Sequence, residues 1–345
     1  MRAVVTLAPN EMSLSSVDEP VLGPSDVIVR PELVGLCGSD IHFFSGHLDI
    51  TPKGPSLYPR IQGHEFSGTV QSVGDEAAGR VEIGARVTAW PLASCGRCYP
   101  CRIGRRSVCD DLDLIGIHTD GALAELVRVP IDQIFAVGDL PAALGAFVEP
   151  MAVAVHGVQR GAVRHAEQVV VLGGGPIGQA VSLAAQARGA RVLLAEPIAS
   201  RRQLGEALGA ELTLDAGADD VVSSVREWTN GEGAPVVIDA TGVPAAIRTA
   251  VDLVASAGRL VVLGISDQQV ALPIGQFTVK EFDMLGSSCH ERADVEEAIR
   301  LVSGARDRLE PCFRTEFALE DAAEALDFSR RRPEAAMKVM VRVSG

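Results

Sequence analysis

The feature that most constrains the fold is the glycine-rich segment Gly173-Gly174-Gly175-Pro176-Ile177-Gly178, which directly follows the apolar run Val169 to Leu172. The segment matches the pattern G-x-G-x-x-G and leads into an alanine-rich stretch with helical character. Glycines at these positions allow a tight turn and let the backbone approach a pyrophosphate at the helix N-terminus. The pattern therefore predicts a dinucleotide-binding unit of strand, helix and strand.

A carboxylate after the next apolar run bears on the choice of cofactor. Glu196 follows Arg191 to Ala195, about twenty residues beyond the glycines. It can accept hydrogen bonds from an adenosine ribose and would repel a 2′-phosphate, so NAD is favoured over NADP. Arg201 or Arg202 could contact a 2′-phosphate, although both also fit solvated helix residues. The candidate cofactor-binding residues are Gly173, Gly175, Pro176, Ile177, Gly178, Glu196, Arg201 and Thr241.

The chain divides into segments of different character. Short apolar runs separated by turn residues, up to about Phe147, predict an irregular β-barrel. From about Pro150, apolar runs alternate with helical segments, which predicts a doubly wound parallel sheet. After Gly286 the pattern changes again, and we expect the last residues to return to the first domain. The expected strands are 26–34, 67–73, 86–90, 123–129, 169–172, 191–195, 235–239, 260–263 and 338–343, and the expected helices are 178–188, 200–208, 294–301 and 319–327.

Length and composition exclude several classes of protein. With 345 residues, 47% of them hydrophobic and 22% charged, the chain is long enough for two or three domains with their own cores. Glycine, proline or charge interrupts every apolar stretch, so we expect no membrane span, no secretory signal and a cytoplasmic location. A net charge of −14, with no basic run longer than Arg330 to Arg332, argues against a nucleic-acid partner.

Four of the seven cysteines lie in one loop, as Cys95-x-x-Cys98-x-x-Cys101 followed by seven residues and Cys109. Two-residue spacing lets thiolates surround one tetrahedral ion, as in a closed structural zinc site. A [4Fe-4S] cluster is the competing possibility, but the fourth spacing is too long for the ferredoxin pattern. The loop predicts a structural-zinc lobe at residues 93–111.

The remaining motifs carry a resemblance to a known family. They are Gly63-His64-Glu65-x-x-Gly68-x5-Gly74, Cys37-Gly38-Ser39-Asp40-Ile41-His42 and Phe147-Val148-Glu149-Pro150. With the cysteine loop and the glycine-rich segment in the same order, the chain resembles the zinc-containing medium-chain alcohol dehydrogenase family over nearly its whole length. The resemblance is closest to the polyol and sugar-acid branch.

The resemblance implies an enzyme that oxidises a secondary alcohol of a polyol or sugar acid to a ketone, with hydride transfer to NAD. It implies a GroES-like catalytic domain at residues 1–149, completed by 287–345, a NAD-binding Rossmann domain at 150–286, and two zinc ions per chain. Members of the family form homo-oligomers, so we expect a dimer or a tetramer. In dimeric members the last sheet strand pairs across a twofold axis, and Gln269 to Leu272 is the candidate here.

Roles for individual residues follow from the same resemblance. Cys37 and His64 ligate the catalytic zinc, and either Glu65 or Glu149 supplies the carboxylate ligand. A fourth position stays open for water or substrate. Asp40 fixes the tautomer of His64.

Two further residues complete the catalytic set. Ser39 and His42 resemble the relay that carries the proton of the alcohol to solvent. A metal ion can lower the pKa of bound water from about 15.7 to about 7, and we expect a bound alcohol to gain in the same way. The catalytic candidates are thus Cys37, Ser39, His42, His64, Glu65 and Glu149.

The sequence indicates the substrate less clearly than it indicates the cofactor and the metal. In sorbitol dehydrogenases an Arg-Tyr pair follows the glycine equivalent to Gly286, whereas this chain has Ser287-Ser288 there. The segment Ile115 to Gly121 and the Glu-Pro pair are more similar to the galactonate-type members. We expect a polyol or sugar acid, with His290 and Arg292 as candidate contacts. L-Threonine 3-dehydrogenase or butanediol dehydrogenase-like activity is the alternative.

Overall fold

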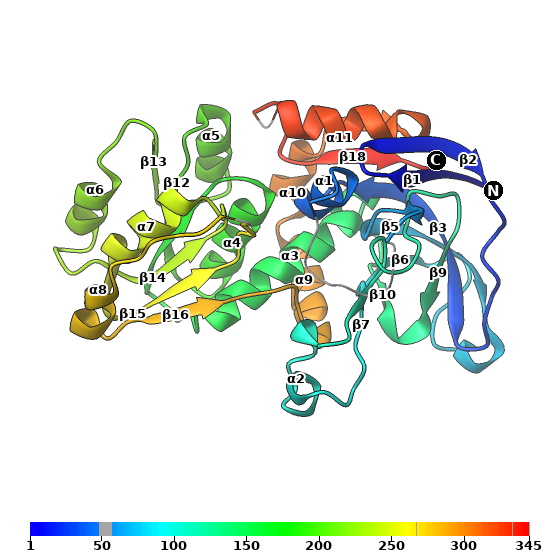
Figure 1. The fold of residues 1–345 in the computed structure, drawn as a ribbon, viewed down its shortest axis with the longest axis horizontal. Helices are drawn as coiled ribbons and strands as arrows, with labels where there is room; N and C mark the ends of the chain where they lie inside the picture. The colour runs from blue at the N-terminus through cyan, green and yellow to red at the C-terminus, as the bar shows by residue number, and fades with distance from the viewer. Residues whose placement is uncertain (48–56, 267, 333, 345) are drawn as a thin grey trace. The chain divides into compact units, whose positions relative to one another are not determined.

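The computed structural model describes residues 1–47, 57–266, 268–332 and 334–344 (Figure 1). The chain forms two compact units, one of Met1–Glu149 with Glu291–Gly345 and the other of Pro150–His290. The helix α3 (Ala142–Arg160) contains the boundary between them. By length and composition α3 could cross a membrane, but 78% of its apolar window is buried inside the protein, as expected of a core helix.

The first unit, called unit 1 below, is built mainly from antiparallel strands. β18 (Val339–Arg342) pairs antiparallel with β3 (Asp26–Gly35), so the end of the chain lies beside an N-terminal strand (Figure 1). One described sheet has the order β10 (Ile134–Ala136), β6 (Arg86–Ala89), β5 (Glu65–Val73), β3, β18 and β17 (Thr315–Ala318), with β9 (Val127–Pro130) also on β3. Two smaller ones join β2 (Glu11–Ser16), β1 (Arg2–Ala8) and β4 (Arg60–Ile61), and β7 (Leu92–Ala93) and β8 (Asp113–Leu114).

Short helices surround these sheets. The described helices of unit 1 other than α3 are α1 (Gly38–Phe44), α2 (Tyr99–Arg102), α9 (Arg292–Gly304), α10 (Arg306–Leu309) and α11 (Ala322–Arg331). Short 3-10 turns lie at Asp75–Ala77, Arg106–Val108, Ile131–Gln133, Glu310–Cys312 and Leu319–Asp321. The last of these turns begins the segment in which the sequence predicted a helix from residue 319, so α11 starts three residues later than expected.

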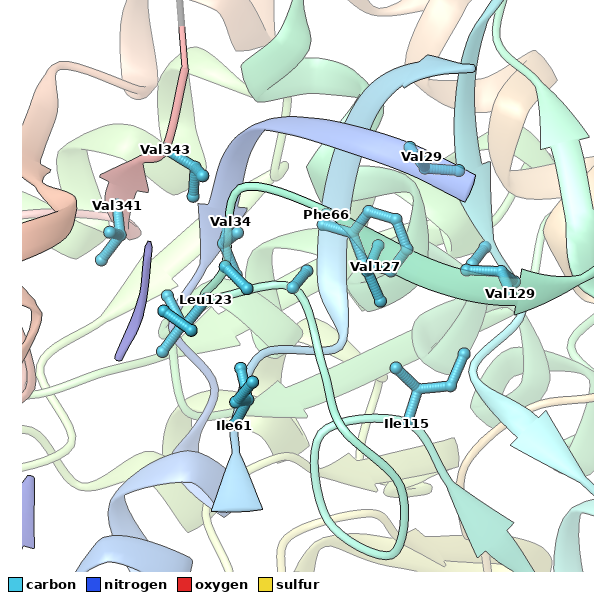
Figure 2. Packing of buried hydrophobic residues seen from close by; sticks show 14 of the residues in the cluster. Val29, Val34, Ile61, Phe66, Ile115, Leu123, Val127, Val129, Val341 and Val343 are labelled. Atoms are coloured by element: carbon cyan, nitrogen blue, oxygen red, sulfur yellow. The ribbon is translucent and has the colours of Figure 1, made fainter. Parts of the chain in front are cut away.

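The core of unit 1 joins side chains from strands that are distant in sequence. Val34 of β3, Phe66 of β5, Val127 of β9 and Val341 of β18 belong to one buried cluster (Figure 2). Leu123 joins the same cluster, although the expected strand 123–129 begins only at Val127. The segment before β9 bonds to other parts of unit 1 instead: the N–H of Leu123 donates to the carbonyl oxygen of Gln62, just after β4, and that of Glu125 donates to Arg2 of β1.

Gly68 of the Gly-His-Glu motif must be a glycine because β5 and β3 approach each other closely at this position. Gly68 lies opposite Pro31 in the pairing of β5 with β3, where the register shifts. A Cβ atom on Gly68 would lie 2.2 Å from the carbonyl oxygen of Arg30. The close approach of the two strands therefore requires glycine, and it fixes how the start of β5 faces the end of β3.

The second unit, called unit 2 below, contains a parallel sheet in the order β13 (Leu212–Leu214), β12 (Arg191–Ala195), β11 (Gln168–Leu172), β14 (Ala234–Asp239), β15 (Val254–Val262) and β16 (Asp283–Gly286). All five pairings are parallel, which confirms the predicted doubly wound sheet. Its helices are α4 (Pro176–Ala187), α5 (Ala199–Ala207), α6 (Val221–Trp228), α7 (Pro244–Leu253) and α8 (Ile274–Lys280).

The edge of this sheet differs from expectation. Gln269 to Leu272 is not a strand but an irregular segment leading to Pro273, the N-cap of α8. The edge strand is β16, and its side chains are mostly exposed. The proposed pairing segment was wrong because an isolated Val-Ala-Leu triplet before a proline is too short to distinguish a strand from a helix entry.

Candidate active site

Three side chains that could hold a metal meet where two neighbouring strands of unit 1 come together. Cys37 follows β3 as the N-cap of α1, whereas His64 and Glu65 lie at the start of β5. The antiparallel pairing places Gly35 opposite Glu65, so these segments coincide. The ligand atoms of Cys37, His64 and Glu65 lie within 4.8 Å of one another. A thiolate, an imidazole and a carboxylate at this spacing fit a zinc ion with one position open.

The imidazole of His64 lies between two residues of α1. Its Nε2 is 3.4 Å from the hydroxyl of Ser39, and its Nδ1 is 3.7 Å from Oδ1 of Asp40. Burial alone would lower the pKa of His64, but Asp40, Cys37 and Glu149 raise it well above its usual value. Surroundings that favour positive charge on this ring also favour a cation bound to it. The electrostatics of the site thus agree with a metal ion.

A buried lysine, which the sequence analysis missed, pairs with Glu65. Nζ of Lys338 lies 2.6 Å from Oε1 of Glu65 and also contacts Oε2. The two side chains are only 5% and 1% exposed. Burial lowers the pKa of Lys338, but the charges of Glu65, Cys37 and Glu149 outweigh it and raise the pKa. The signal in the sequence was a single lysine at the start of the apolar run that forms β18.

Glu149, the other candidate carboxylate, is buried in α3 directly before Pro150. Burial raises its pKa to about 7, although the neighbouring His64 opposes the shift. Glu149 is thus close enough to interact with the site, but it is Glu65 whose oxygen lies within the 4.8 Å cluster with Cys37 and His64.

The four cysteines of the predicted lobe also lie together. The Sγ atoms of Cys95, Cys98, Cys101 and Cys109 are within 4.8 Å of one another. The distance between Cys98 and Cys109 is 3.7 Å, and a tetrahedron with Zn–S bonds of about 2.3 Å requires about 3.8 Å. Backbone N–H groups, including that of Arg97, lower the pKa of Cys95 to about 6, whereas burial raises that of Cys109 to about 12. A cation bound among these sulfur atoms favours the thiolate form of the buried cysteines, which fits a structural zinc.

In unit 2 the glycine-rich turn and Glu196 are joined directly. Gly175 is the N-cap of α4 and Pro176 its first residue, as the motif requires. The carboxylate of Glu196 accepts hydrogen bonds from the backbone N–H of Gly174 at 2.6 Å and of Ile198 at 2.9 Å. Nη1 of Arg201 is 3.9 Å from the same carboxylate. The predicted cofactor residues therefore lie around one turn.

Two residues near this turn, Arg202 and Thr241, interact with other side chains of unit 2. Arg202 pairs with Asp215 at 2.9 Å and donates to the carbonyl oxygen of Glu196. The hydroxyl of Thr241 donates to Asp239 at 2.6 Å, and its methyl group packs against Gly173. Arg202 is therefore less available for a 2′-phosphate than Arg201.

The remaining candidates lie apart from the cluster or at the surface. His42 is exposed on α1, one turn after Ser39. His290 is buried in unit 2. Arg292 pairs with Glu296 at the surface of α9, so its proposed contact with substrate gains no support from its surroundings.

Comparison with known sequences gives two family matches. Residues 23–139 match the description "Alcohol dehydrogenase GroES-like domain", and residues 176–304 match "Zinc-binding dehydrogenase". The 2-dehydro-3-deoxy-L-galactonate 5-dehydrogenase of Pseudoalteromonas atlantica is 33% identical over 335 residues, which is 95% of either chain.

Two solved structures that are similar to this chain contain a nicotinamide cofactor, NADP in one and NADH in the other. A zinc-binding dehydrogenase from Sinorhizobium meliloti 1021 bound to NADP has a TM-score of 0.91 and 32% identity, covering 99% of each chain. An alcohol dehydrogenase from Escherichia coli CFT073 complexed with NADH has a TM-score of 0.89 and 28% identity, again covering 99% of each chain.

The Glu65–Lys338 pair generates a first prediction. A Cβ atom on Gly35 would lie 2.5 Å from Oε2 of Glu65 and 3.0 Å from the Lys338 side chain. We therefore expect Gly35→Ala to displace Glu65 and weaken zinc binding at this site by about 10- to 100-fold. After dialysis against a weak chelator, the zinc content of the variant should fall from two ions per chain towards one. Gly304→Ala, where a Cβ meets nothing within 4 Å, is the control and should keep both ions. Two retained ions in Gly35→Ala would contradict the expectation.

The glycine-rich turn generates a second prediction. A Cβ on Gly178 would lie 1.7 Å from the carbonyl oxygen of Gly173, whereas one on Gly175 would meet only Arg201 Nη1, at 3.8 Å. We expect Gly178→Ala to lower the free energy of unfolding by about 1–3 kcal/mol. Gly175→Ala should keep its melting temperature but bind NAD about tenfold more weakly, because the added methyl group obstructs a pyrophosphate. Calorimetry would check both, and native affinity in Gly175→Ala would contradict the assignment.

Proposed function

The chain belongs to the zinc-binding alcohol dehydrogenase family with a GroES-like domain, and on this premise we propose which of its residues carry the reaction. The enzyme oxidises a secondary alcohol of a polyol or sugar acid to a ketone, with hydride transfer to NAD. The observation that carries the assignment of residues is the cluster of Cys37, His64 and Glu65 at the junction of β3 and β5.

We assign Cys37, His64 and Glu65 to the catalytic zinc. When bound, zinc acts as a Lewis acid that lowers the pKa of a substrate hydroxyl. Asp40 orients His64 from the Nδ1 side, and Lys338 holds Glu65 in a fixed position. Holding the ligands rigidly leaves the open position for substrate rather than for a fourth side chain.

Proton release is assigned to α1. Ser39 lies beside His64 and is placed to accept a hydrogen bond from the substrate hydroxyl, and the exposed His42, one turn further along α1, can exchange a proton with solvent. Glu149 is assigned a supporting electrostatic role, because its charge acts on His64 without its oxygen being part of the ligand cluster.

We assign the structural zinc to Cys95, Cys98, Cys101 and Cys109, in the lobe at residues 93–111 of unit 1. NAD is assigned to the turn formed by Gly173, Gly175, Pro176, Ile177 and Gly178, with Glu196, Arg201 and Thr241 around it. In this assignment unit 1 is the catalytic domain, residues 1–149 completed by the C-terminal part, and unit 2 is the NAD-binding domain.

The substrate class, assembly and location complete the proposal. Similarity to a galactonate-type dehydrogenase supports a sugar acid, and Ser287-Ser288 in place of an Arg-Tyr pair weighs against sorbitol. The exposed edge strand β16 supports a homodimer, or a tetramer built from such dimers, because unpaired backbone groups at a sheet edge favour pairing with a second chain. We place the enzyme in the cytoplasm, where thiols remain reduced for zinc.

The choice between NAD and NADP depends on Glu196. Glu196→Gln removes the negative charge that repels a 2′-phosphate, so we expect the ratio of kcat/KM for NAD over NADP to fall about tenfold. Glu206→Gln, an exposed change on the adjacent α5, should leave the ratio unchanged. An unaltered ratio in Glu196→Gln would remove Glu196 from the selection of cofactor.

The assigned reaction is tested with a panel of alcohols and NAD or NADP, followed by absorbance at 340 nm. The panel includes aldonates, galactitol, sorbitol, inositols, threonine and butanediol. We expect NAD reduction with a sugar acid or polyol, lost after chelation and restored by zinc. Turnover of threonine or butanediol alone would replace the substrate class, and activity that survives complete removal of zinc would exclude the assigned mechanism.

A further inference from the structure

We propose that Gln62 is a positioning residue for the catalytic zinc, which holds Asp40 against His64, and that Thr6 holds Gln62 in turn. The inference rests on the proposed zinc site and adds two residues, from β1 and the end of β4, that lie outside its ligand set. Neither residue belongs to the motifs that identify the family in this sequence.

The contacts form a continuous buried chain. The hydroxyl of Thr6 donates to Oε1 of Gln62 at 2.6 Å. Nε2 of Gln62 donates to the carbonyl oxygen of Asp40 at 2.9 Å and lies 3.4 Å from its Oδ1. Oδ1 of Asp40 is in turn 3.7 Å from Nδ1 of His64. Thr6, Gln62 and Asp40 are all 0% exposed, so no solvent competes along the chain.

Hydrogen-bond chemistry fixes the direction of this chain. If the amide of Gln62 were turned over, its oxygen would face the carbonyl and carboxylate oxygens of Asp40, which are all acceptors. The nitrogen must therefore face Asp40, and the oxygen must accept from Thr6. Gln62 therefore accepts a hydrogen bond from the Thr6 hydroxyl on β1 and donates one from its amide nitrogen to Asp40, the residue beside His64.

The carboxylate of Asp40 is consequently held at both oxygens. Oδ2 accepts from the backbone N–H of Cys37 at 2.9 Å, and Oδ1 faces both Gln62 and His64. Nδ1 of His64 has no hydrogen-bond partner among the described residues. A neutral imidazole that binds a metal through Nε2 carries its proton on Nδ1, and the oxygen that Gln62 holds in place is the acceptor available to it.

The backbone of Gln62 is itself rigidly placed. The segment from Ile61 to Gly63 accepts three backbone hydrogen bonds, from the N–H groups of Gly121, Leu123 and Ala122. Ile61 and Leu123 both belong to the core cluster of unit 1 (Figure 2). The side chain of Gln62 therefore extends from a fixed support, so its amide can determine where Asp40 lies.

A role in folding alone does not account for an amide at this position. Burying a glutamine costs free energy even when its hydrogen bonds are made, and an apolar side chain beside Ile61 would extend the core without that cost. The partner of the amide is Asp40, whose carboxylate faces Nδ1 of His64. The free-energy cost of burying this amide is explained if its hydrogen bonds position Asp40 beside the zinc ligand His64.

The test compares zinc release from the intact enzyme and its Gln62→Met variant. The rate at which a chelator removes each zinc is followed with a colorimetric indicator, and the cobalt-substituted enzyme is examined by visible absorption. Gln62→Met removes the donor to Asp40 at similar volume. Because loss of an outer partner of a ligand typically costs 10- to 100-fold, we expect the catalytic zinc to leave about tenfold faster. The cobalt spectrum should also change, and zinc should leave the cysteine lobe at its native rate.

A double variant separates positioning from stability. Gln62→Met leaves the hydroxyl of Thr6 unsatisfied and therefore lowers the melting temperature, whereas Thr6→Val with Gln62→Met removes both polar partners together. We expect the double variant to recover the part of the thermal stability that was lost at the Thr6 hydroxyl but to keep the faster zinc release. If zinc release returns to the native rate together with stability, the residues act on the fold only and the inference is wrong.

A matched control and the native enzyme complete the design. Gln133 is another buried glutamine of unit 1, and its Nε2 has no hydrogen-bond partner among the described residues, so Gln133→Met should release zinc at the native rate. Equal acceleration by Gln133→Met, or native release in Gln62→Met, would overturn the inference while the zinc site remains. A native enzyme without a chelator-labile zinc outside the cysteine lobe would overturn the proposed site and this inference together.

Discussion

The ion pair between Lys338 and Glu65 joins the end of the chain to the beginning of the metal site. Lys338 precedes β18, Glu65 begins β5, and Gly35 of β3 leaves the space through which the two side chains meet. A buried ion pair contributes little net stability, but removal of one partner leaves an uncompensated charge and is strongly unfavourable. The pair therefore depends on the complete pairing of β5, β3 and β18. The C-terminal segment thus supplies the cation that holds the Glu65 carboxylate in place beside Cys37 and His64.

Other buried charged groups of unit 1 also need a balancing charge. Asp40, Glu65 and Glu149 place acidic groups around one imidazole, and Lys338 supplies a single positive charge. A divalent cation balances such a set better than protons do, because it can be shared among a thiolate, an imidazole and a carboxylate. The cysteine lobe follows the same principle: burial raises the pKa of Cys101 and Cys109, and a bound cation favours their thiolate form. In unit 2 two backbone N–H groups, those of Gly174 and Ile198, hold the carboxylate of Glu196 in place beside the glycine-rich turn.

The sequence predicted those features that depend on local patterns. The turn at Gly173 to Gly178, the parallel sheet and the clustering of four cysteines follow from spacing, and the structure has all three. Contacts between distant segments could not be predicted. Lys338 is 273 residues from Glu65 and Thr6 is 56 from Gln62, so their pairing depends on strand order. The start of β9 was misjudged because backbone hydrogen bonds to other segments, rather than apolar periodicity, decide where that strand begins. The edge strand was misjudged because the apolar triplet before Pro273 is too short to distinguish a strand from a helix entry.

The central claim is that unit 1 holds a zinc ion between Cys37, His64 and Glu65, separate from the zinc of the cysteine lobe. Anomalous X-ray diffraction recorded on either side of the zinc absorption edge locates each ion directly in crystals of the enzyme. We expect two zinc peaks per chain, one within bonding distance of Cys37, His64 and Glu65 and one among the four cysteines. A single peak in the lobe, with none beside Cys37 in crystals grown with zinc, would contradict the account.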